Sequence, residues 1–586
     1  MGIGASDFVA GVMPGGSSDI DRMVEAVEEK GGNPQVYETP DIALLSTGSQ
    51  IDQGDVKVGF GGYLYGLDES ETPEEKVARL YREHGESFPR ELEGGFRVAL
   101  YDSTKDYLYL ATDVKGSKPV YFSKGEKLVF GGYITTLLAN PRVDNRIDRG
   151  AVIEHLNTCF NIYSGNRTLL KDVKSMHNSS VLRYGDRSVD RNIYWEVYNS
   201  PKLSLPESQT AYVMEELFRE GVEKSVEKAD EINILLSGGF DSTFLTAFMD
   251  ENVEKPVKTY TWAFIDEQVE EAKEAADLLG VDNEVVKVPQ RLPRSELLWE
   301  MELPLTSLNF SRTTFVRDIG VEETFSGMSD SITFPVGLKN FRHLNRLRRL
   351  KPLFRAADKI NLDNLFVRLA RRWDERIGNG FDILTSPYQS AVLTNMRVPR
   401  QKKFSELVPE SEDPYRLERK VDEQWDLEPR GFDENFTYLM LRERNINHVS
   451  TVTKPVRHYD PFTYKPLLEF SFRIPMQQKK NRRFARKIAE DYLPREVVEK
   501  EPSGLGSTLQ KSLNRSLKSD REEYRRTVRR FLSRGLLREG KAEEFLLKDV
   551  MSRPTFHKTF MSEVFILEKW IQTFVEREDP WTSPGD

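Results

Sequence analysis

The spacing of apolar residues divides the chain into two parts with different patterns. Up to about residue 195, short apolar runs alternate with Gly and Asp turns, a pattern that predicts strands. Helical spacing appears in this part at 19–30 and 73–84. The expected strands are 8–12, 42–45, 56–60, 96–101, 107–111 and 128–130. Such a mixture predicts an α+β domain of stacked β-sheets with flanking helices.

The second part alternates strand and helix patterns. A linker rich in Pro and Ser, 196–208, leads into it, so we expect two domains, 1–195 and 209–586. The predicted order is helix 209–228, strand 233–236, helix 240–249, strand 257–264, helix 269–279 and strand 285–288. This alternation predicts an α/β fold with a doubly wound parallel sheet. Residues 510–586 have the spacing of additional amphipathic helices.

The turn between the first of these strands and its helix has the composition of a phosphate site. Segment 237–242 reads S-G-G-F-D-S. Gly238 and Gly239 let the backbone approach a ligand closely, and the first-turn N–H groups of the helix point at an anion. Strand–Gly–Gly–helix turns also occur without a ligand, but the full S-G-G-x-D-S pattern is more specific. No Lys follows the glycines, so the segment is not a Walker A loop.

The polar side chains of this turn extend the prediction. Ser237 and Ser242 offer hydroxyl donors, and Asp241 is placed to hold Mg²⁺ on the phosphates. The segment resembles the pyrophosphate loop of ATP pyrophosphatases, a group that includes asparagine, β-lactam, GMP and argininosuccinate synthetases. We therefore expect ATP and Mg²⁺ as the ligands.

Composition narrows the class of protein. The net charge of −10 and the sequence pI near 5.6 argue against nucleic acid as the main partner. The single cysteine, Cys159, excludes an internal disulfide and a Cys-rich metal site, and we interpret it as a packed apolar residue. No apolar run of 18 or more residues and no charged-then-apolar leader is found, so we predict a cytoplasmic protein with no transmembrane segment.

Three segments of the first part carry a more specific resemblance. Residues 92–102 (LEGGFRVALYD) resemble the L-x-G-x-F-A-F-A-L-W-D stretch of asparagine synthetases, and 111–122 resemble their A-R-D-x-x-G-I-K-P-L-Y-Y. Residues 127–132 and the pair Tyr194-Trp195 also match in order. The chain thus resembles the asparagine synthetase family, whose N-terminal domain is an N-terminal-nucleophile (Ntn) glutaminase.

The resemblance fails at the glutaminase chemistry. That mechanism uses an N-terminal Cys, but Met1 is followed by Gly2, and the nucleophile position falls on internal Asp7. The counterpart of the family's N-G-E-I-Y-N loop is 61–66 (GGYLYG), which lacks both asparagines and the Glu. We predict that this domain keeps its fold without glutaminase activity.

The second family motif, S-G-E-G-x-D-E, has a partial match in 326–332. Ser326 and Gly327 match the residues that contact AMP, whereas Met328 replaces the first acid and Ser331 takes the place of the magnesium Asp. Asp330 is one residue away and either substitutes as the catalytic metal ligand or is a solvated turn residue. By the same resemblance Leu235 and Ala263 would flank adenine, with plain sheet packing as the alternative.

The C-terminal segment resumes the resemblance. Residues 456–475 are similar to the family's R-x-P-F-x-D pattern, with Tyr464 in place of the Asp. In 482–494 the family's catalytic Lys falls on Arg482, which keeps the charge and either braces phosphate or is a surface cation. A basic run in 339–376 is interpreted as a solvated helix face, with an anionic substrate or membrane surface as alternatives.

The resemblance implies a ligase reaction. A small-molecule carboxylate would be adenylated by ATP, and ammonia or an amine would then attack to give an amide, AMP and pyrophosphate. Two alternatives stay open: a nucleotide-binding pseudoenzyme or scaffold, and an intramolecular ligase similar to β-lactam synthetases. A pyrophosphatase-type reaction on a sugar or tRNA is disfavoured by the first domain, and a homodimer is left open.

Overall fold

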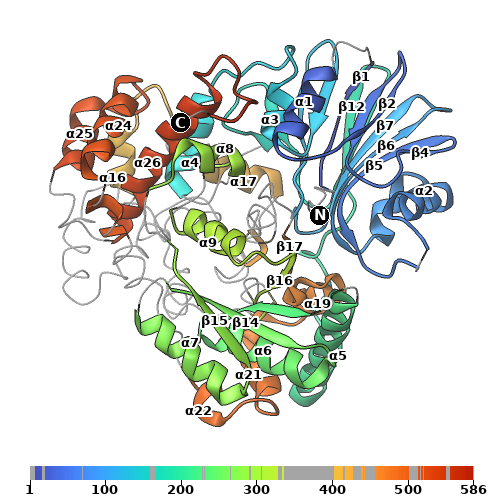
Figure 1. Ribbon diagram of the computed structural model, residues 1–586, viewed down its shortest axis with the longest axis vertical. Coiled ribbons are helices and arrows are strands. Elements are labelled where there is room, and N and C mark those ends of the chain that lie inside the picture. The colour runs from blue at the N-terminus through green and yellow to red at the C-terminus, as the bar shows by residue number, and fades with distance from the viewer. Residues whose placement is uncertain are drawn as a thin grey trace.

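The computed structural model describes most of the chain. The described residues are 7–15, 20–68, 70–158, 166–227, 229, 231–263, 266–288, 292–304, 307–327, 333–334, 401–413, 416–425, 437–439, 441, 456–500, 513–514, 516–518, 520–548 and 555–584. Figure 1 shows the β-rich N-terminal part and a parallel sheet, with the C-terminal helices (red) sharing an apolar core with the N-terminal part.

Two antiparallel sheets form the N-terminal domain. The first has the order β10 (Val173–Ser175), β8 (Tyr121–Lys124), β9 (Leu128–Gly131), β1 (Val9–Met13), β3 (Ala43–Ser46) and β2 (Gln35–Glu38). The second has the order β12 (Ser188–Ile193), β11 (Ser180–Gly185), β7 (Tyr107–Thr112), β6 (Gly94–Asp102), β5 (Val56–Leu64) and β4 (Asp52–Gln53). These strands confirm the stacked-sheet prediction.

Side-chain alternation on the strands explains the layers. On β3, Leu44 faces the core between the sheets, whereas Ala43 and Leu45 face the outer helices. On β6, Ala99 faces the inter-sheet core and Val98 faces α2. The flanking helices are α1 (Asp21–Glu29), α2 (Pro73–His84), α3 (Ile134–Leu138) and α4 (Arg149–Thr158), with a 3-10 segment η2 (Gly85–Glu91). Both faces of β3 and β6 are therefore apolar.

The second domain contains a parallel sheet whose strand order reverses at its centre. The described strands have the order β15 (Asp282–Val286), β14 (Val257–Trp262), β13 (Ile232–Leu235), β16 (Glu323–Phe325) and β17 (Arg457–Tyr459). The chain adds β14 and β15 on one side of β13 and then returns to place β16 on the other side. Ligands bind at the carboxyl ends of strands beside such a switch point.

Helices cover both faces of this sheet, as the doubly wound prediction requires. Ile232 and Ile234 pack against Phe244 of α6 (Phe240–Asn252), while Leu235 packs against Phe315 of α9 (Ser307–Asp318). The other helices of this domain up to residue 498 are α5 (Glu207–Val226), α7 (Asp266–Leu279), α8 (Ser295–Met301), η6 (Pro461–Thr463), α19 (Lys465–Arg473), α20 (Met476–Lys479), α21 (Arg483–Ala489) and α22 (Arg495–Val498).

The C-terminal helices share a core with the N-terminal domain. They are α16 (Gln401–Leu407), α17 (Arg416–Trp425), α24 (Arg521–Ser533), α25 (Glu539–Leu547) and α26 (Thr555–Phe574). Phe565 and Trp570 of α26 belong to the same apolar cluster as Met23 of α1 and Leu137 of α3. Among the described helices, none is both long enough and apolar enough to cross a membrane.

Candidate functional site

The S-G-G-F-D-S turn lies at the carboxyl end of the central strand. It connects β13 to the first turn of α6, and Gly239 is the residue that precedes the helix. Gly238 has φ +72°, and a Cβ there would lie 2.4 Å from the carbonyl carbon of Glu271. Both constraints require Gly at this position. The backbone of the turn therefore adopts a conformation and a close contact that only Gly allows at position 238, in agreement with the role predicted for the glycines.

Hydroxyl groups hold the turn in place. The Ser242 Oγ accepts a hydrogen bond from the Ser237 N–H at 3.1 Å and lies 3.0 Å from the Ser237 Oγ. Ser242 is buried and Ser237 is exposed. Ser242 thus acts as an internal brace, whereas Ser237 is the hydroxyl that a ligand can reach.

Asp241 and Arg482 meet although 241 residues separate them. The Arg482 Nη2 donates to the Asp241 Oδ2 in an ion pair whose side chains are 9% and 26% exposed. Arg482 precedes α21 in the left-handed backbone region, with φ +55°. Its guanidinium also lies 6.0 Å from the ring centre of Phe240. The two candidate residues, predicted independently, therefore belong to one site.

The loop after β16 reaches the same place. A Cβ added to Gly327 would lie 3.2 Å from the carbonyl oxygen of Asp241. Ser326 is 3% exposed, and its N–H donates to the Tyr459 carbonyl oxygen at 3.2 Å. The first and second motifs are thus adjacent across the switch point between β13 and β16.

A buried histidine that the sequence analysis did not single out supports this second loop. His458 on β17 is 2% exposed, its Nε2 lies 2.9 Å from the Ser326 Oγ, and its Nδ1 lies 2.9 Å from the Thr324 Oγ1. Burial lowers the pKa of His458 to about 3, so the ring is neutral. Nearby cations add to the lowering: Arg312, Lys115 and Lys118. Only its place three residues before the matched Pro461 could have drawn attention to it.

Lys500 is a second residue that the sequence analysis missed. Its Nζ donates to the Gly238 carbonyl oxygen at 3.3 Å and lies 3.5 Å from a carboxylate oxygen of Glu271. Arg486 fixes this segment by donating to the carbonyl oxygens of Val498 and Lys500. A cation therefore lies beside the turn.

Leu235 and Ala263 lie at the carboxyl ends of neighbouring strands. Leu235 is half-buried in the cluster that contains Tyr260 and Phe315. Ala263 is half-buried, and its N–H donates to the Val286 carbonyl oxygen at 2.9 Å. Both positions border the switch-point edge, and their contact with adenine stays a prediction.

The position aligned with the glutaminase nucleophile is part of a buried charge cluster. Asp7 pairs with Lys118 at 2.5 Å, and the two side chains are 8% and 4% exposed. Lys118 and the fully buried Arg97 hold the pKa of Asp7 below its usual range despite its burial. In the 92–102 segment, Arg97 stands where the resembled family has Ala. The cluster provides a carboxylate and two cations but no thiol.

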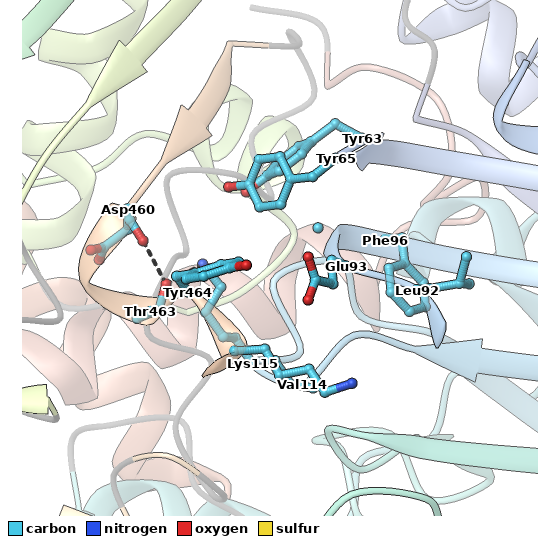
Figure 2. Close-up of a pocket in the computed structure, with 12 residues that line it drawn as sticks. Tyr63, Tyr65, Leu92, Glu93, Phe96, Val114, Lys115, Asp460, Thr463 and Tyr464 are labelled. Carbon is cyan, nitrogen blue, oxygen red and sulfur yellow. Dashed lines mark hydrogen bonds between the residues drawn. The ribbon is translucent and has the colours of Figure 1, made fainter. Parts of the chain in front are cut away.

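Two cavities lie where the domains meet. The smaller, of about 20 Å³, has room for about one water molecule and is lined by Glu93, Lys115 and Asp460 together with tyrosines (Figure 2). The larger, of about 520 Å³, is an open cleft that includes Gly62 and Arg457. The ring centres of Tyr63 and Tyr459 are 4.7 Å apart, so the N-terminal domain contacts the strand that carries His458.

Several predicted residues lie outside the described part of the chain. These are Met328, Asp330, Ser331, Cys159 and the basic run 339–376. Among the described residues, no group of three or more His, Cys, Asp or Glu side chains gathers to hold a metal ion. The metal prediction therefore depends on Asp241 and on phosphate oxygens that a nucleotide would bring.

Comparisons with known proteins agree with both halves of the fold. The glutamine amidotransferase domain family matches residues 60–195. Asparagine synthetase [glutamine-hydrolyzing] 3 of Bacillus subtilis is 28% identical over 192 residues, which cover 32% of this chain and 31% of that protein. Asparagine synthetase [glutamine-hydrolyzing] 2 of the same organism is 21% identical over 282 residues, 46% of this chain and 36% of that protein. The chain thus spans about a third of these relatives' length.

A solved structure was also found, but its similarity is low. Glutamine phosphoribosylpyrophosphate (PRPP) amidotransferase from B. subtilis, complexed with ADP and GMP, has a TM-score of 0.23 and 10% identity, over 54% of this chain and 80% of that one. The asparagine synthase family matches residues 213–572, which is more than half of the chain and includes both loops of the candidate site. The chain belongs to the asparagine synthase family.

Proposed function

We propose that the protein is an ATP-dependent, AMP-forming amide ligase without glutaminase activity. In the first step a carboxylate oxygen attacks the α-phosphorus of ATP, and the bond to pyrophosphate breaks. In the second step ammonia or an amine attacks the acyl carbon, the bond to AMP breaks and the nitrogen loses a proton. The substrates are a small-molecule carboxylate and an amine or ammonia.

One observation carries this proposal: the turn 237–239 and the pair Ser326–Gly327 meet at the switch point of a parallel sheet. Exposed Ser237 and the first-turn N–H groups of a 13-residue helix suit the pyrophosphate of ATP. Arg482 and Lys500 add positive charge at the same turn. These groups would stabilise the negative charge that builds on the departing pyrophosphate.

The site also suits Mg²⁺. This ion is commonly held by one or two carboxylates together with substrate phosphates, and Asp241 offers a carboxylate within the turn motif. When bound, the ion would neutralise charge on the phosphates. The Asp241 carboxylate pairs with Arg482 in this structure, so we infer that Arg482 moves toward the pyrophosphate when the ion binds.

The Asp7 cluster supports the second half of the proposal. If Asp7 occupies the nucleophile position, the site offers a carboxylate held in an ion pair by Lys118, which is a poor nucleophile toward an amide. The domain, 1–195, would then serve as a structural partner of the ligase domain, 209–586. Ammonia would come from solution, or the amine would belong to a substrate.

Exchange of radiolabelled pyrophosphate into ATP tests the ligase. The purified protein is incubated with Mg-ATP and a panel of carboxylates, with and without ammonium, and we expect exchange with at least one acid. Asp241→Asn should abolish the exchange, and Glu274→Gln, which changes an exposed carboxylate on α7, should not. ATP binding with no exchange for any acid would reject the ligase. Release of glutamate from glutamine would reject the proposal that the protein lacks glutaminase activity.

A nucleotide-binding pseudoenzyme is a second candidate that one observation favours. The carboxylate expected to hold the metal is already paired with Arg482. If Arg482 keeps this pair when nucleotide binds, ATP would bind without Mg²⁺. An ATP affinity that does not change on addition of EDTA would support this candidate.

A further inference from the structure

His458 and the second nucleotide loop are joined by a chain of three polar groups. Thr324 on β16 and His458 on β17 are direct partners in the parallel pairing, and Ser326 follows Thr324 on the same face. The imidazole therefore bridges both hydroxyls, at 2.9 Å from each. All three residues are at most 3% exposed.

The direction of the hydrogen bonds decides what Ser326 offers to a ligand. A neutral imidazole has one N–H and one lone pair, so it donates to one hydroxyl and accepts from the other. Within the described residues, Thr324 has no acceptor for its O–H except His458 Nδ1. If Nδ1 carried the proton, the Thr324 hydrogen would be buried without an acceptor, at a cost of about 1–3 kcal/mol. If Nε2 carries it, the Ser326 hydrogen is the one left over, and an anion bound beside Gly327 would supply its acceptor. A bound anion therefore favours the tautomer with the proton on Nε2.

The favoured arrangement leaves the Ser326 hydrogen available. Thr324 O–H donates to Nδ1, the Nε2–H donates to the Ser326 Oγ, and the Ser326 O–H then points away from the ring. Gly327 follows directly and lies against the backbone of Asp241. The hydrogen is thus held beside the phosphate turn, where an anion would accept it.

We propose that His458 is a positioning residue of the nucleotide site, which fixes the Ser326 hydroxyl as a hydrogen-bond donor to a phosphate oxygen of the nucleotide. This inference rests on the proposed function, because it deepens the role of Ser326 in the same site. His458 does not touch the nucleotide in this scheme and acts only through Ser326.

Packing on the other face of the strands keeps the ring in place. Phe325 and Tyr459 stack there with ring centres 5.1 Å apart, and Tyr63 of the N-terminal domain contacts Tyr459. Asp460, which follows on the same segment, lies among the charged groups near Arg312 and Lys115. The hydrogen-bonded chain of Thr324, His458 and Ser326 therefore lies next to a contact between the two domains. A change in that contact would shift β17 and, with it, the hydrogen bond from His458 to Ser326.

Equilibrium binding of radiolabelled Mg-ATP to the full-length protein tests the proposal. Ser326→Ala and His458→Leu should each raise the Kd about tenfold, the usual effect of losing one hydrogen bond to a charged group. The double variant should be no weaker than either single variant, because both remove the same donor. His458→Gln, whose amide can donate to Ser326, should stay within about threefold of the wild type.

Thr324→Val tests whether the hydrogen-bonded chain, rather than packing around His458, sets the affinity for ATP. It removes the group that sets the tautomer without touching Ser326, and the Kd should rise severalfold. Thr259→Val is its matched control, because it deletes a buried hydroxyl from β14 that bonds Asp282 and Asn283 instead. That variant should bind ATP as the wild type does. The wild-type Kd should not change between pH 6 and pH 8, because the ring stays neutral.

The outcomes are distinguishable. If the wild type binds no ATP, the proposed function fails and this inference falls with it. If Ser326→Ala weakens binding while His458→Leu and His458→Gln both leave the Kd unchanged, only the role of His458 is rejected. Additive effects in the double variant would also reject it, since His458 would then act independently of Ser326.

Discussion

At the scale of single residues, the ion pair of Asp241 and Arg482 indicates which contact would have to rearrange when Mg-ATP binds. A guanidinium and a bound metal ion would compete for the same carboxylate, and the side chains of Asp241 and Arg482 are only 26% and 9% exposed. Because removing one member of a partly buried ion pair is costly, an anionic ligand would compensate Arg482 if Mg²⁺ displaced it from Asp241. The pyrophosphate of ATP would be such a ligand under the proposed function.

Asp241→Asn is therefore expected to weaken Mg-ATP binding by at least tenfold. The amide lacks the negative charge that would attract the metal, and it also removes the ion pair between positions 241 and 482. The Kd for Mg-ATP, measured by titration calorimetry, checks this. Glu274→Gln is the control, and ATP affinity in EDTA should differ little between the wild type and Asp241→Asn. An unchanged Kd in Mg²⁺ would mean that Asp241 holds no metal.

Arg482→Lys tests whether Arg482 acts in the adenylation step rather than in the binding of ATP. Lys keeps the charge but loses the planar fork that braces a phosphate group with two donors. We expect pyrophosphate exchange to fall by about 10²-fold, the scale reported for loss of one transition-state donor, with the KM for ATP changed less than fivefold. Equal losses in KM and in rate would instead assign Arg482 to ground-state binding.

His458 gives a prediction on stability and pH. Its pKa is about 3 in the fold and 6.5 in the unfolded chain, so below pH 6.5 the unfolded state binds a proton that the folded state does not. Lowering the pH from 7 to 5 should thus cost about 2 kcal/mol of folding free energy from this residue alone. Urea unfolding at both pH values should show a smaller loss for His458→Gln than for the wild type. Equal losses would contradict the neutral buried ring.

At the scale of elements, the local pattern of apolar residues and glycines was enough to predict the strand, turn and helix that carry the site, but not the contacts between them and other segments. The apolar run before Ser237, the two glycines and the helical spacing after them predicted β13, the turn and α6, because each depends on neighbours in sequence. The strand expected at 285–288 lies instead at Asp282–Val286. Its start is polar, and Asn283 accepts hydrogen bonds from Thr259 and Thr261 of β14, which an apolar pattern does not reveal.

Gly238→Ala tests whether the turn depends on its backbone. At φ +72° an Ala costs about 1–2 kcal/mol, and its Cβ would clash with the Glu271 backbone at 2.4 Å. We expect a lower urea midpoint and loss of ATP binding. Gly540→Ala on α25 is the control, because no atom lies within 4 Å of its Cβ position, and it should be neutral or stabilising. Wild-type ATP affinity in Gly238→Ala would show that the turn adapts.

At the scale of the whole molecule, long-range pairs join the domains, and sequence spacing could not predict them. Trp195, at the end of the N-terminal domain, donates to Glu469 at 2.6 Å, and Lys224 pairs with Glu93 at 3.0 Å. The contact of Arg482 with Asp241 is also long-range, but it lies within the second domain. Each joins segments more than 100 residues apart, so only the fold brings them together.

Glu302 is the most connected of these junctions, because it joins four elements. Its carboxylate pairs with the buried Lys30 at 3.1 Å and accepts from the first N–H groups of α3, at Ile134 and Thr135. Its carbonyl oxygen accepts from the Trp570 indole of α26 at 2.7 Å. Glu302 itself ends α8, which lies between β15 and β16 in the chain. The residue therefore links the N-terminal sheets to the ligase domain.

Glu302→Gln should consequently destabilise both domains together, by about 3–5 kcal/mol, because it leaves the Lys30 ammonium buried without a counter-charge. Lys30→Met should cost less, since the carboxylate keeps its backbone donors, and the double variant should recover part of the loss. Urea unfolding followed by tryptophan fluorescence measures this, because Trp299 lies 4.0 Å from Lys30. Glu83→Gln, in an exposed pair, should shift stability by less than about 0.5 kcal/mol. If Glu302→Gln matched that control, the Lys30–Glu302 pair would contribute nothing measurable to the stability of the two domains.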